Sequence, residues 1–407
     1  MEIVKIAIMG FGTIGSGIAE VLEKQRNVIT TRTGKVFEVA KILEPRDFSL
    51  HPMKDRFCDS IDEILKDDTI SVVAEAIGGI NPAFELVMKC INAKKHVVTS
   101  NKELVATKGV EILKAAYAND VGFLFEASVG GTIPVISSMI GILSANNITS
   151  IDAIVNGTTN YILTNMQKKN ISFEHALERA QDLGYAETID PSADIDGHDA
   201  ARKIAILASL SYGYQVPVEK VRTEGIRQIT HSDFELAESL NGTIKLIASA
   251  KGASYSEATV SVRPAFVSKG SRFAAVEDVN NMISLTCDMS GTVTLAGAGA
   301  GKLPTAAVMV GDIIELSTKT ISRAPLWSEA LEAVEEAEEI PLKYFVTVFS
   351  ENKRIITRLV EQVEATSVDE NSAAFFTSRI MISEAEKLKR QLKSHNVVVK
   401  LFEVVED

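Results

Sequence analysis

Residues 3–25 read IVKIAIMGFGTIGSGIAEVLEKQ, and this stretch decides the fold of the N-terminal part of the chain. The run up to Met9 is apolar apart from one lysine, which predicts a buried strand, and the residues after Gly15 repeat apolar side chains at helical spacing. The loop between them has the pattern G-x-G-x-x-G. A strand, this loop and a helix in succession are typical of a dinucleotide-binding fold.

The glycine loop has the conformational freedom that a bound dinucleotide needs. Glycines permit a tight turn and a close approach of the backbone to a pyrophosphate, which rests on the helix N-terminus. A tight strand-to-helix turn without a ligand is the alternative interpretation. We predict that the loop binds the cofactor through Gly10, Phe11, Gly12, Thr13, Ile14 and Gly15.

Strand and helix patterns alternate after this loop. Strands are expected at 37–43, 71–79, 96–102 and 122–128, with helices at 60–67, 82–95 and 110–121. This alternation predicts a doubly wound parallel sheet, a Rossmann-type domain over residues 1–130. Ligands of such sheets bind beyond the carboxyl ends of the strands. Ser100 and Lys102 follow one such end, so we expect both at the cofactor site.

The end of the second strand bears on the choice of cofactor. A carboxylate there would bind the ribose hydroxyls of NAD, whereas an arginine would accommodate the additional phosphate of NADP. The sequence offers both, as Glu44 and Arg46. We therefore expect NADP or NAD as the cofactor and leave the preference open.

Residues 180–203 read AQDLGYAETIDPSADIDGHDAARK and gather several carboxylates around one lysine. Asp199 and Lys203 are four residues apart, so they share one helix face. The apolar run IAILASL follows, which predicts a partly buried Lys203. Carboxylates beside an amine suit a small zwitterion and its proton, although a solvated surface pair is the ordinary alternative.

The pattern A-x3-G-Y-A-x3-D-P-x2-D-I-x-G-x-D-x3-K in this segment resembles the signature of homoserine dehydrogenases. Further segments agree with that family in order, namely the glycine loop, SNKELVA at 100–106, EASVGGTIP at 126–134, NGTTNYIL at 156–163 and GAGAGKLPTAA at 297–307. The resemblance spans about residues 1–330. It implies the reversible NAD(P)-dependent oxidation of L-homoserine to L-aspartate 4-semialdehyde, in threonine, methionine and isoleucine biosynthesis.

The resemblance also implies roles for single residues. Lys203 matches the lysine that donates and accepts the proton, and Lys102 matches a second lysine near the nicotinamide. Glu187 matches the residue that binds the substrate ammonium group, and Asp199 should orient Lys203 or hold substrate. The remaining candidates are Asp194, Gly157, Thr158 and Tyr185 for the substrate, and Gly299 for the cofactor.

The segment 126–134 resembles a loop that binds a monovalent cation in some relatives. Its ligands would be the Glu126 carboxylate and the backbone carbonyls of Val129, Gly131 and Ile133. Ligation by oxygen alone suits a hard cation such as Na+. A glycine-rich turn without an ion is the alternative.

The rest of the resembling region predicts an α+β catalytic and dimerisation domain over residues 131–320. Alternating residues at 148–158 and 258–267, with further strands over 279–301, predict an open sheet covered by helices. A helix at 305–317 should return to the nucleotide domain. The resemblance implies a homodimer or homotetramer.

The end of the sequence has a pattern of its own. Residues 321–342 predict an acidic helical linker, and 343–407 give strand, helix, strand, helix and strand, with a further short strand near 364–369. This order resembles a small ferredoxin-like ACT domain. The turn Glu351-Asn352-Lys353-Arg354 lacks the proline and glycine of that family, so we expect no threonine-like effector there. A pure dimerisation or stability module is the alternative.

Composition narrows the class of protein. Apolar content of 46% and charged content of 24% are ordinary for a globular protein. The net charge of -12 would repel nucleic acid or an anionic membrane surface, so neither is expected as the main partner. No apolar run is long enough for a bilayer, the N-terminus does not resemble a signal peptide, and the three scattered cysteines suit a reducing cytoplasm.

Two alternative functions are also consistent with the sequence. One is another amino-acid semialdehyde dehydrogenase or reductase, which the 180–203 pattern disfavours. The other is a non-catalytic NAD(P)-binding metabolite sensor. A sensor has no need of the lysines that serve the chemistry, and both Lys102 and Lys203 are present.

Overall fold

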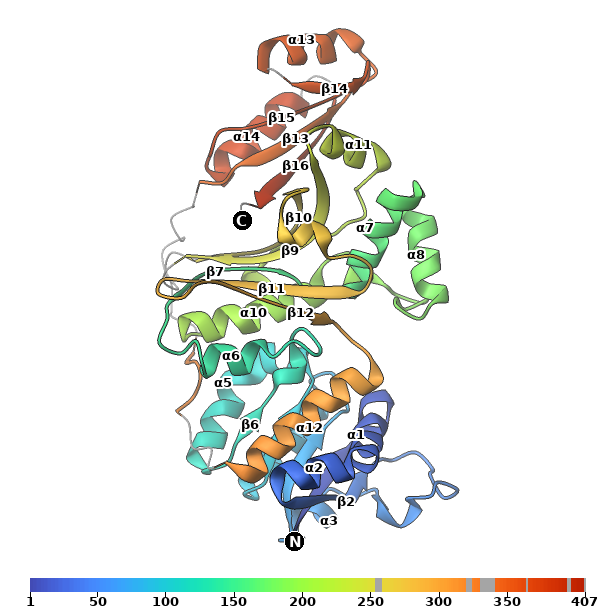
Figure 1. The fold of residues 1–407 in the computed structure, drawn as a ribbon, viewed down its shortest axis with the longest axis vertical. Helices are drawn as coiled ribbons and strands as arrows, with labels where there is room; N and C mark the ends of the chain where they lie inside the picture. Colours follow the sequence, from blue (N-terminus) through green and yellow to red (C-terminus); the bar gives the residue numbers. More distant parts are fainter. Residues whose placement is uncertain (253–257, 320–323, 330–340, 364, 394–396, 406–407) are drawn as a thin grey trace. The chain divides into compact units, whose positions relative to one another are not determined.

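The computed structural model describes residues 1–252, 258–319, 324–329, 341–363, 365–393 and 397–405 (Figure 1). These residues divide into two compact units. The first unit comprises Met1–Asn146, Ala205–Val218 and Gly297–Glu332. The second comprises Asn147–Ile204, Glu219–Ala296 and Ala333–Asp407. Most of the predicted linker 321–342, including its acidic run, lies outside the described residues.

In the described residues, the first unit is built on a six-stranded parallel sheet in the order β3-β2-β1-β4-β5-β6. This is the strand order of a Rossmann fold, so the predicted fold class is confirmed. The strands are β1 (Glu2–Met9), β2 (Lys35–Leu43), β3 (Phe57–Cys58), β4 (Ile70–Glu75), β5 (His96–Thr99) and β6 (Phe123–Leu124).

The helices of the first unit follow the predicted alternation. They are α1 (Thr13–Lys24), α2 (Arg26–Thr33), α3 (Asp62–Leu65), α4 (Ala83–Asn92), α5 (Lys102–Ala118), α6 (Val135–Ile140) and α12 (Lys302–Thr318). Although α12 comes late in the sequence, it packs beside α1 in this unit (Figure 1). A glycine at position 17 permits this packing, because a Cβ there would lie 3.0 Å from the Cβ of Ala306.

In the described residues, the second unit is built on a ten-stranded mixed sheet. Its main order is β12-β11-β7-β9-β10-β16-β13-β15-β14, and β8 pairs separately with β10. The strands are β7 (Ile148–Ile154), β8 (Arg222–Thr223), β9 (Gly242–Lys251), β10 (Thr259–Ser268), β11 (Asn280–Cys287), β12 (Gly291–Ala298), β13 (Tyr344–Phe349), β14 (Thr366–Asp369), β15 (Ser372–Phe376) and β16 (Val398–Val405). Its helices are α7 (Gly157–Lys169), α8 (Phe173–Asp182), α9 (Ser192–Ile195), the first part of α10 (His198–Tyr212), α11 (His231–Ser239), α13 (Lys353–Val363) and α14 (Ile382–Lys393).

The C-terminal segment follows the predicted order, including the short additional strand β14. Its strands have the order β16-β13-β15-β14, which is that of a ferredoxin-like βαββαβ unit. Apolar side chains of α13 and α14 pack on one face of these strands. On the other face Thr347 and Lys400 bond to Asp233 of α11. Because β16 also pairs with β10, the segment continues the sheet of the second unit.

Several predicted boundaries are wrong. The strands expected to end at 79 and 128 end at Glu75 and Leu124, and the helix expected from 110 begins at Lys102. Helix caps explain two further differences. The strand expected to continue to 102 ends at Thr99, because Asn101 caps α5. The strand expected to continue to 158 ends at Ile154, because Asn156 caps α7. The turn expected at 351–354 is shorter, since α13 begins at Lys353.

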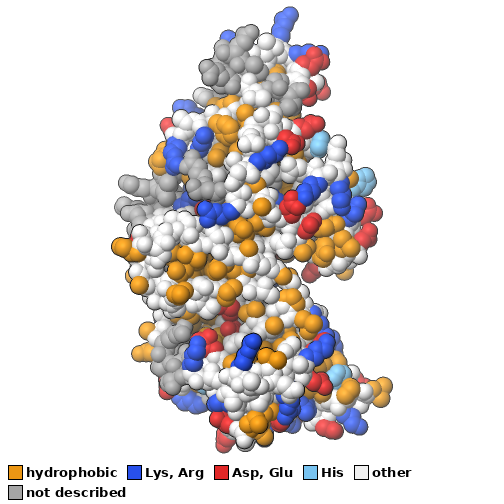
Figure 2. All heavy atoms as spheres, in the orientation of Figure 1, with side chains coloured by type: hydrophobic (Ala, Val, Ile, Leu, Met, Phe, Trp, Pro, Cys, Tyr) orange, Lys and Arg blue, Asp and Glu red, His pale blue; other side chains and the backbone are white. Residues whose placement is uncertain are grey.

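Surface chemistry is mixed. On the face drawn in Figure 2, Lys and Arg side chains are interspersed with Asp and Glu. The three cysteines all lie in the described part of the chain and are free and buried. Among the described helices, none has both the length and the apolar character needed to cross a membrane.

Candidate active site

The glycine loop of the first unit is shaped by close backbone contacts. Gly10 has a φ of 87°, and a Cβ there would lie 2.8 Å from the carbonyl oxygen of Ala76. A Cβ on Gly15 would lie 1.9 Å from the carbonyl oxygen of Gly10. Gly12 caps α1 without a side-chain hydrogen bond, and no described atom lies within 4 Å of its ideal Cβ position. The loop therefore leaves the N-terminus of α1 open to a phosphate, as a dinucleotide requires.

Phe11 helps to hold this loop. Its ring is buried against Phe48 and Phe57, with ring centroids 5.4 and 5.1 Å away. Its backbone N–H donates a 2.8 Å hydrogen bond to Glu44. Phe11 was predicted as a cofactor ligand, but its N–H is already engaged within the protein.

The two candidates for cofactor choice form an ion pair. The Arg46 side chain donates to both carboxylate oxygens of Glu44, each at 2.8 Å. These bonds lower the pKa of Glu44 to about 2. The Glu44 side chain is only 5% exposed, whereas that of Arg46 is 62% exposed. Glu44 thus faces the glycine loop and its charge is neutralised, while Arg46 faces solvent.

Lys102 and Ser100 follow β5, where buried side chains hold two loops together. Glu75 at the end of β4 is fully buried and accepts backbone hydrogen bonds from Ile77 and Gly78, at 2.7 and 3.0 Å. Its second oxygen accepts from the hydroxyl of Thr99. The side chain of Asn101 caps α5 and donates to the carbonyl of Gly79 at 2.6 Å. Glu75 was not among the predicted site residues, although its place at the end of a buried apolar strand is visible in the sequence.

In the candidate cation loop, two of the predicted ligand groups accept hydrogen bonds from nearby backbone N–H groups. The Glu126 carboxylate accepts from the backbone N–H groups of Ile136 and Ser137, at 2.8 and 2.6 Å. Its burial raises its pKa, and burial beside Glu126 raises that of Asp312. The carbonyl of Ile133 accepts from Val135 at 2.8 Å. Two predicted ligands are therefore engaged within the protein, and the cation site stays a prediction.

Other residues of that loop pack closely on the segment that precedes α12. Gly131 has a φ of 60°, and a Cβ there would lie 2.5 Å from the backbone of Gly299. Val129 is fully buried. The contact places Gly299, a predicted cofactor residue, directly against the glycine turn of the predicted cation loop.

Lys203 is the centre of a polar cluster in the second unit. Its ammonium group lies 2.7 Å from the carboxylate of Asp199 and donates a 2.7 Å hydrogen bond to the carbonyl of Val155. The Lys203 side chain is 11% exposed, as the apolar helix after it predicted. The spacing of four on α10 brings the two charged groups together.

Asn156 connects this cluster to α7. Its amide donates to Asp194 at 2.7 Å and to Asp199 at 2.9 Å, while its oxygen accepts from the N–H of Thr159 and so caps the helix. The structure thus brings Lys203, Asp199 and Asp194 together through Asn156, which was not among the predicted site residues. The signal was present, since asparagine is a preferred N-cap residue.

The remaining substrate candidates lie around the start of α7 and before α9. The Thr158 hydroxyl donates to the carbonyl of Tyr185 at 2.7 Å, and the Tyr185 ring packs edge-on against Tyr161. Gly157 is the first residue of α7. Glu187 lies outside the Lys203 cluster: it is exposed, and its backbone carbonyl accepts a hydrogen bond from Gln181.

Comparison with known proteins agrees with this arrangement. A family model described as "Homoserine dehydrogenase, NAD binding domain" matches residues 10–126, and one described as "Homoserine dehydrogenase" matches 134–314. The chain is 42% identical over 319 residues to a homoserine dehydrogenase of Synechocystis, covering 77% of this chain and 73% of that protein.

Solved structures agree as well. A homoserine dehydrogenase from Thiobacillus denitrificans matches with a TM-score of 0.88 and 30% identity, over 100% of this chain and 99% of that one. A hyperthermophilic archaeal homoserine dehydrogenase in complex with NADPH matches with a TM-score of 0.65 and 29% identity, over 77% of this chain and 98% of that one. The chain therefore belongs to the homoserine dehydrogenase family.

Proposed function

We propose that this chain catalyses the reversible NAD(P)-dependent oxidation of L-homoserine to L-aspartate 4-semialdehyde, with Lys203 transferring the hydroxyl proton. The observation that carries the proposal is the cluster in which Asp199 and the Val155 carbonyl hold the Lys203 amine. An amine has three positions for hydrogen bonds, and these two contacts leave one for the substrate oxygen.

Each half of the reaction has its own residues. Bound NAD(P) supplies the hydride acceptor or donor, and the glycine loop would hold its pyrophosphate at the N-terminus of α1. In the oxidation, Lys203 as the unprotonated amine takes the proton of the alcohol while the carbon gives up its hydride. In the reduction, Lys203 returns that proton to the developing alkoxide. Lys102, at the start of α5, is proposed to lie near the nicotinamide.

Charge decides how the substrate is held. Glu187, with Asp194 as the second candidate, is proposed to bind the substrate ammonium group. The N-terminus of α7, at Gly157 and Thr158, is proposed to offer donors to the substrate carboxylate, because helix N-termini favour anions. Asp199 keeps the Lys203 amine in place.

Assembly and location complete the proposal. We propose a homodimer or homotetramer that works in the cytoplasm. Support for assembly comes from β12, which is the edge strand of the sheet and has several exposed residues. Light scattering of the purified protein would measure the mass.

The proposed reaction can be tested directly. The purified chain should reduce NAD+ or NADP+ when L-homoserine is added at alkaline pH, followed by the absorbance of the reduced nicotinamide. Side-by-side titration of the two cofactors measures the preference. Nucleotide binding without turnover would favour the sensor instead.

Lys203→Ala tests the residue that carries the mechanism. A positioned acid or base contributes about 10²–10⁴-fold, so kcat should fall by that factor while cofactor binding is retained. Near-normal turnover of this variant would contradict the role of Lys203.

A further inference from the structure

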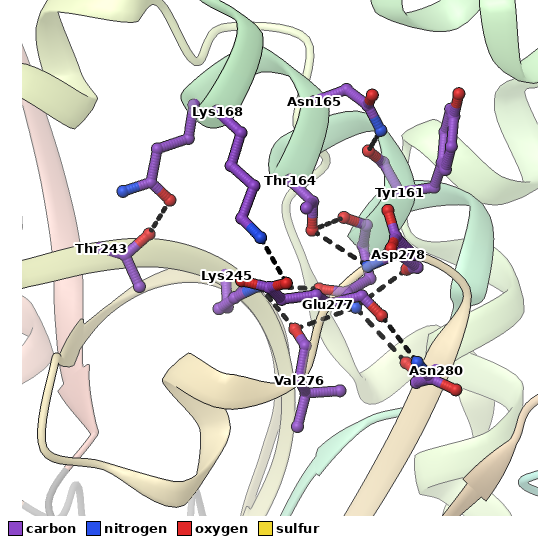
Figure 3. A network of polar contacts seen from close by, with 12 residues as sticks. Tyr161, Thr164, Asn165, Lys168, Thr243, Lys245, Val276, Glu277, Asp278 and Asn280 are labelled. Carbon is purple, nitrogen blue, oxygen red and sulfur yellow. Dashed lines mark hydrogen bonds and ion pairs between the residues drawn. The ribbon is translucent and has the colours of Figure 1, made fainter.

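Lys245 is buried far more deeply than a lysine normally is. It lies on β9, where every residue except the last is buried, and it is only 3% exposed. Its ammonium group donates to the carbonyl of Val276 at 2.6 Å (Figure 3). It also donates to the side-chain oxygen of Asn160 at 3.2 Å. Among the described residues both hydrogen-bond partners are neutral. An unpaired buried charge is unfavourable for stability, so such a lysine calls for another explanation.

The partners of Lys245 belong to one hydrogen-bond network between α7 and the loop 276–280. Asn160 is itself buried and donates its amide to three carbonyls of the loop 276–280, at 3.2 Å to Val276, 3.0 Å to Asp278 and 3.3 Å to Asn280. The hydroxyl of Thr164 accepts from the N–H of Asp278 at 3.3 Å. Lys245 and the two α7 residues therefore hold this loop against the helix.

Charged side chains lie around this hydrogen-bond network but are not part of it. Glu277 and Asp278 of the loop and Lys168 of α7 are the charged groups that act on Lys245. Lys168 forms an ion pair with Glu277, and both side chains are exposed (Figure 3). Burial lowers the pKa of Lys245 to about 8.

The held loop touches the start of α7, which carries the reaction site. A Cβ on Gly157 would lie 2.8 Å from the carbonyl oxygen of Val279. One residue earlier, Asn156 holds Asp194 and Asp199, and Asp199 holds Lys203. Asn156 and Asn160 are one helical turn apart, and the N–H of Asn160 donates to the carbonyl of Asn156. A movement of the loop would therefore move the residue that orients the catalytic carboxylates.

We propose that Lys245 is a positioning residue for the reaction: with Asn160 it fixes the loop 276–280 on the first turn of α7, and so sets the position of Asn156, Asp199 and Lys203. This inference rests on the proposed function of Lys203. Lys245 does not touch the reacting atoms. It acts through a chain of contacts that lies entirely within the second unit.

Lys245→Met is the direct test, because methionine is similar in length and uncharged. A displacement of about 1 Å in a catalytic group can lower the rate by up to about 10²-fold, so kcat/KM for homoserine should fall roughly tenfold to a hundredfold. The KM for NADP+ should stay unchanged, and the melting temperature should not fall with the activity. The matched control is Lys168→Met, which removes the neighbouring exposed charge and should leave all kinetic constants near wild type.

A second variant makes the test independent of how well Lys245→Met folds. Asn160→Ala should lower kcat/KM for homoserine by the same factor. In the double variant, kcat/KM should fall by less than the product of the two single factors, since both residues act through the same hydrogen-bond network. Unchanged homoserine constants in a folded variant would overturn the inference. A parallel loss of homoserine turnover, cofactor binding and melting temperature would overturn it too, because that pattern marks a purely structural lysine. An inactive wild-type chain would instead contradict the proposed function.

Discussion

At the scale of single residues, Lys203 and Lys245 show two ways of placing a lysine in a protein interior. Lys203 is mostly buried beside the carboxylate of Asp199, and its position follows from one turn of α10. Lys245 is buried and donates to two neutral oxygens from separate segments, those of Asn160 and Val276. The first arrangement presents the Lys203 amine to the proposed substrate site. The second holds the loop 276–280 against α7.

Glu187→Gln tests how the substrate ammonium group is held. Loss of a charge-assisted hydrogen bond is worth about 1.5–3 kcal/mol, so the KM for homoserine should rise roughly tenfold to a hundredfold, with the cofactor constants unchanged. Asp182→Asn, which removes another exposed carboxylate nearby, is the control. If the homoserine constant does not move, Asp194 is the next carboxylate to replace.

The stability of the protein should show the titration of Lys245. Its pKa is lowered by burial from 10.5 to about 8. Below pH 8 the lysine is charged in both the folded and the unfolded state, and burying that charge lowers the stability by about 3 kcal/mol. Between about pH 8 and 10.5 the folded state releases its proton first, so this loss of stability is relieved as the pH rises.

Denaturant unfolding of wild type and Lys245→Met at pH 7.5 and pH 10 measures this effect. The free energy of unfolding of the wild type, relative to the variant, should increase between the two pH values by up to about 3 kcal/mol. A difference that is independent of pH would mean that the lysine keeps its ordinary pKa in the folded protein.

The sequence predicts contacts between residues that are close along the chain. The pairing of Asp199 with Lys203 follows from their spacing of four. The two hydrogen-bond partners of Lys245 could not be predicted in this way. Asn160 lies 85 residues before it, and the Val276 carbonyl lies 31 residues after it. Within the strand GTIKLIASAK, the lysine at position 245 is consistent with an exposed position of an alternating strand.

At the scale of helices and strands, caps decide where the site residues lie. Asn101 and Asn156 each end a strand-to-helix connection with a side-chain hydrogen bond to the helix backbone. Lys102 and Gly157 are therefore the first residues of their helices. Periodicity alone continues the preceding strands through both caps, which is why the predicted strand ends were too late.

Gly157→Ala tests the contact between α7 and the loop 276–280. The added Cβ would lie 2.8 Å from the backbone oxygen of Val279, which cannot move aside like a flexible side chain. We expect a loss of stability of about 1–3 kcal/mol and a lower kcat with homoserine. Thermal unfolding and steady-state kinetics measure the two effects.

The control for this variant is Gly311→Ala. Gly311 lies within α12, and no described atom is within 4 Å of its ideal Cβ position. Alanine is the better helix former by about 1 kcal/mol, so this variant should be at least as stable as the wild type. Equal behaviour of the two variants would mean that the loop adapts to a side chain at position 157.

At the scale of the molecule, each unit follows from a different kind of pattern. The alternation of strands and helices predicts the Rossmann sheet of the first unit. The pairing of β16 with β10, which joins the C-terminal segment to the rest of the second unit's sheet, has no local signal in the sequence. Buried side chains strengthen the junction: Lys400 of β16 forms an ion pair with the buried Asp233, and Phe266 of β10 packs on Phe345 and Phe376.

Threonine should not inhibit the intact enzyme strongly. The turn before α13 is Ser350-Glu351-Asn352, without proline or glycine, and Arg354 lies in the first helical turn. An inhibition assay with threonine measures this. A variant ending at residue 341 should lose stability rather than feedback control, because Phe266 loses its covering. Strong inhibition that disappears on truncation would show that the altered turn still binds an effector.

The place of β16 has a consequence for how the protein is made. The ribosome synthesises this strand after every other strand of the sheet, yet it fits between β10 and β13. At about 5–20 residues per second, roughly ten seconds pass between the completion of β10 and the start of β16. During that interval part of the β10 edge and Phe266 await their partners. The nascent chain therefore needs protection from edge-to-edge association, and a chaperone or slow folding of the second unit would provide it.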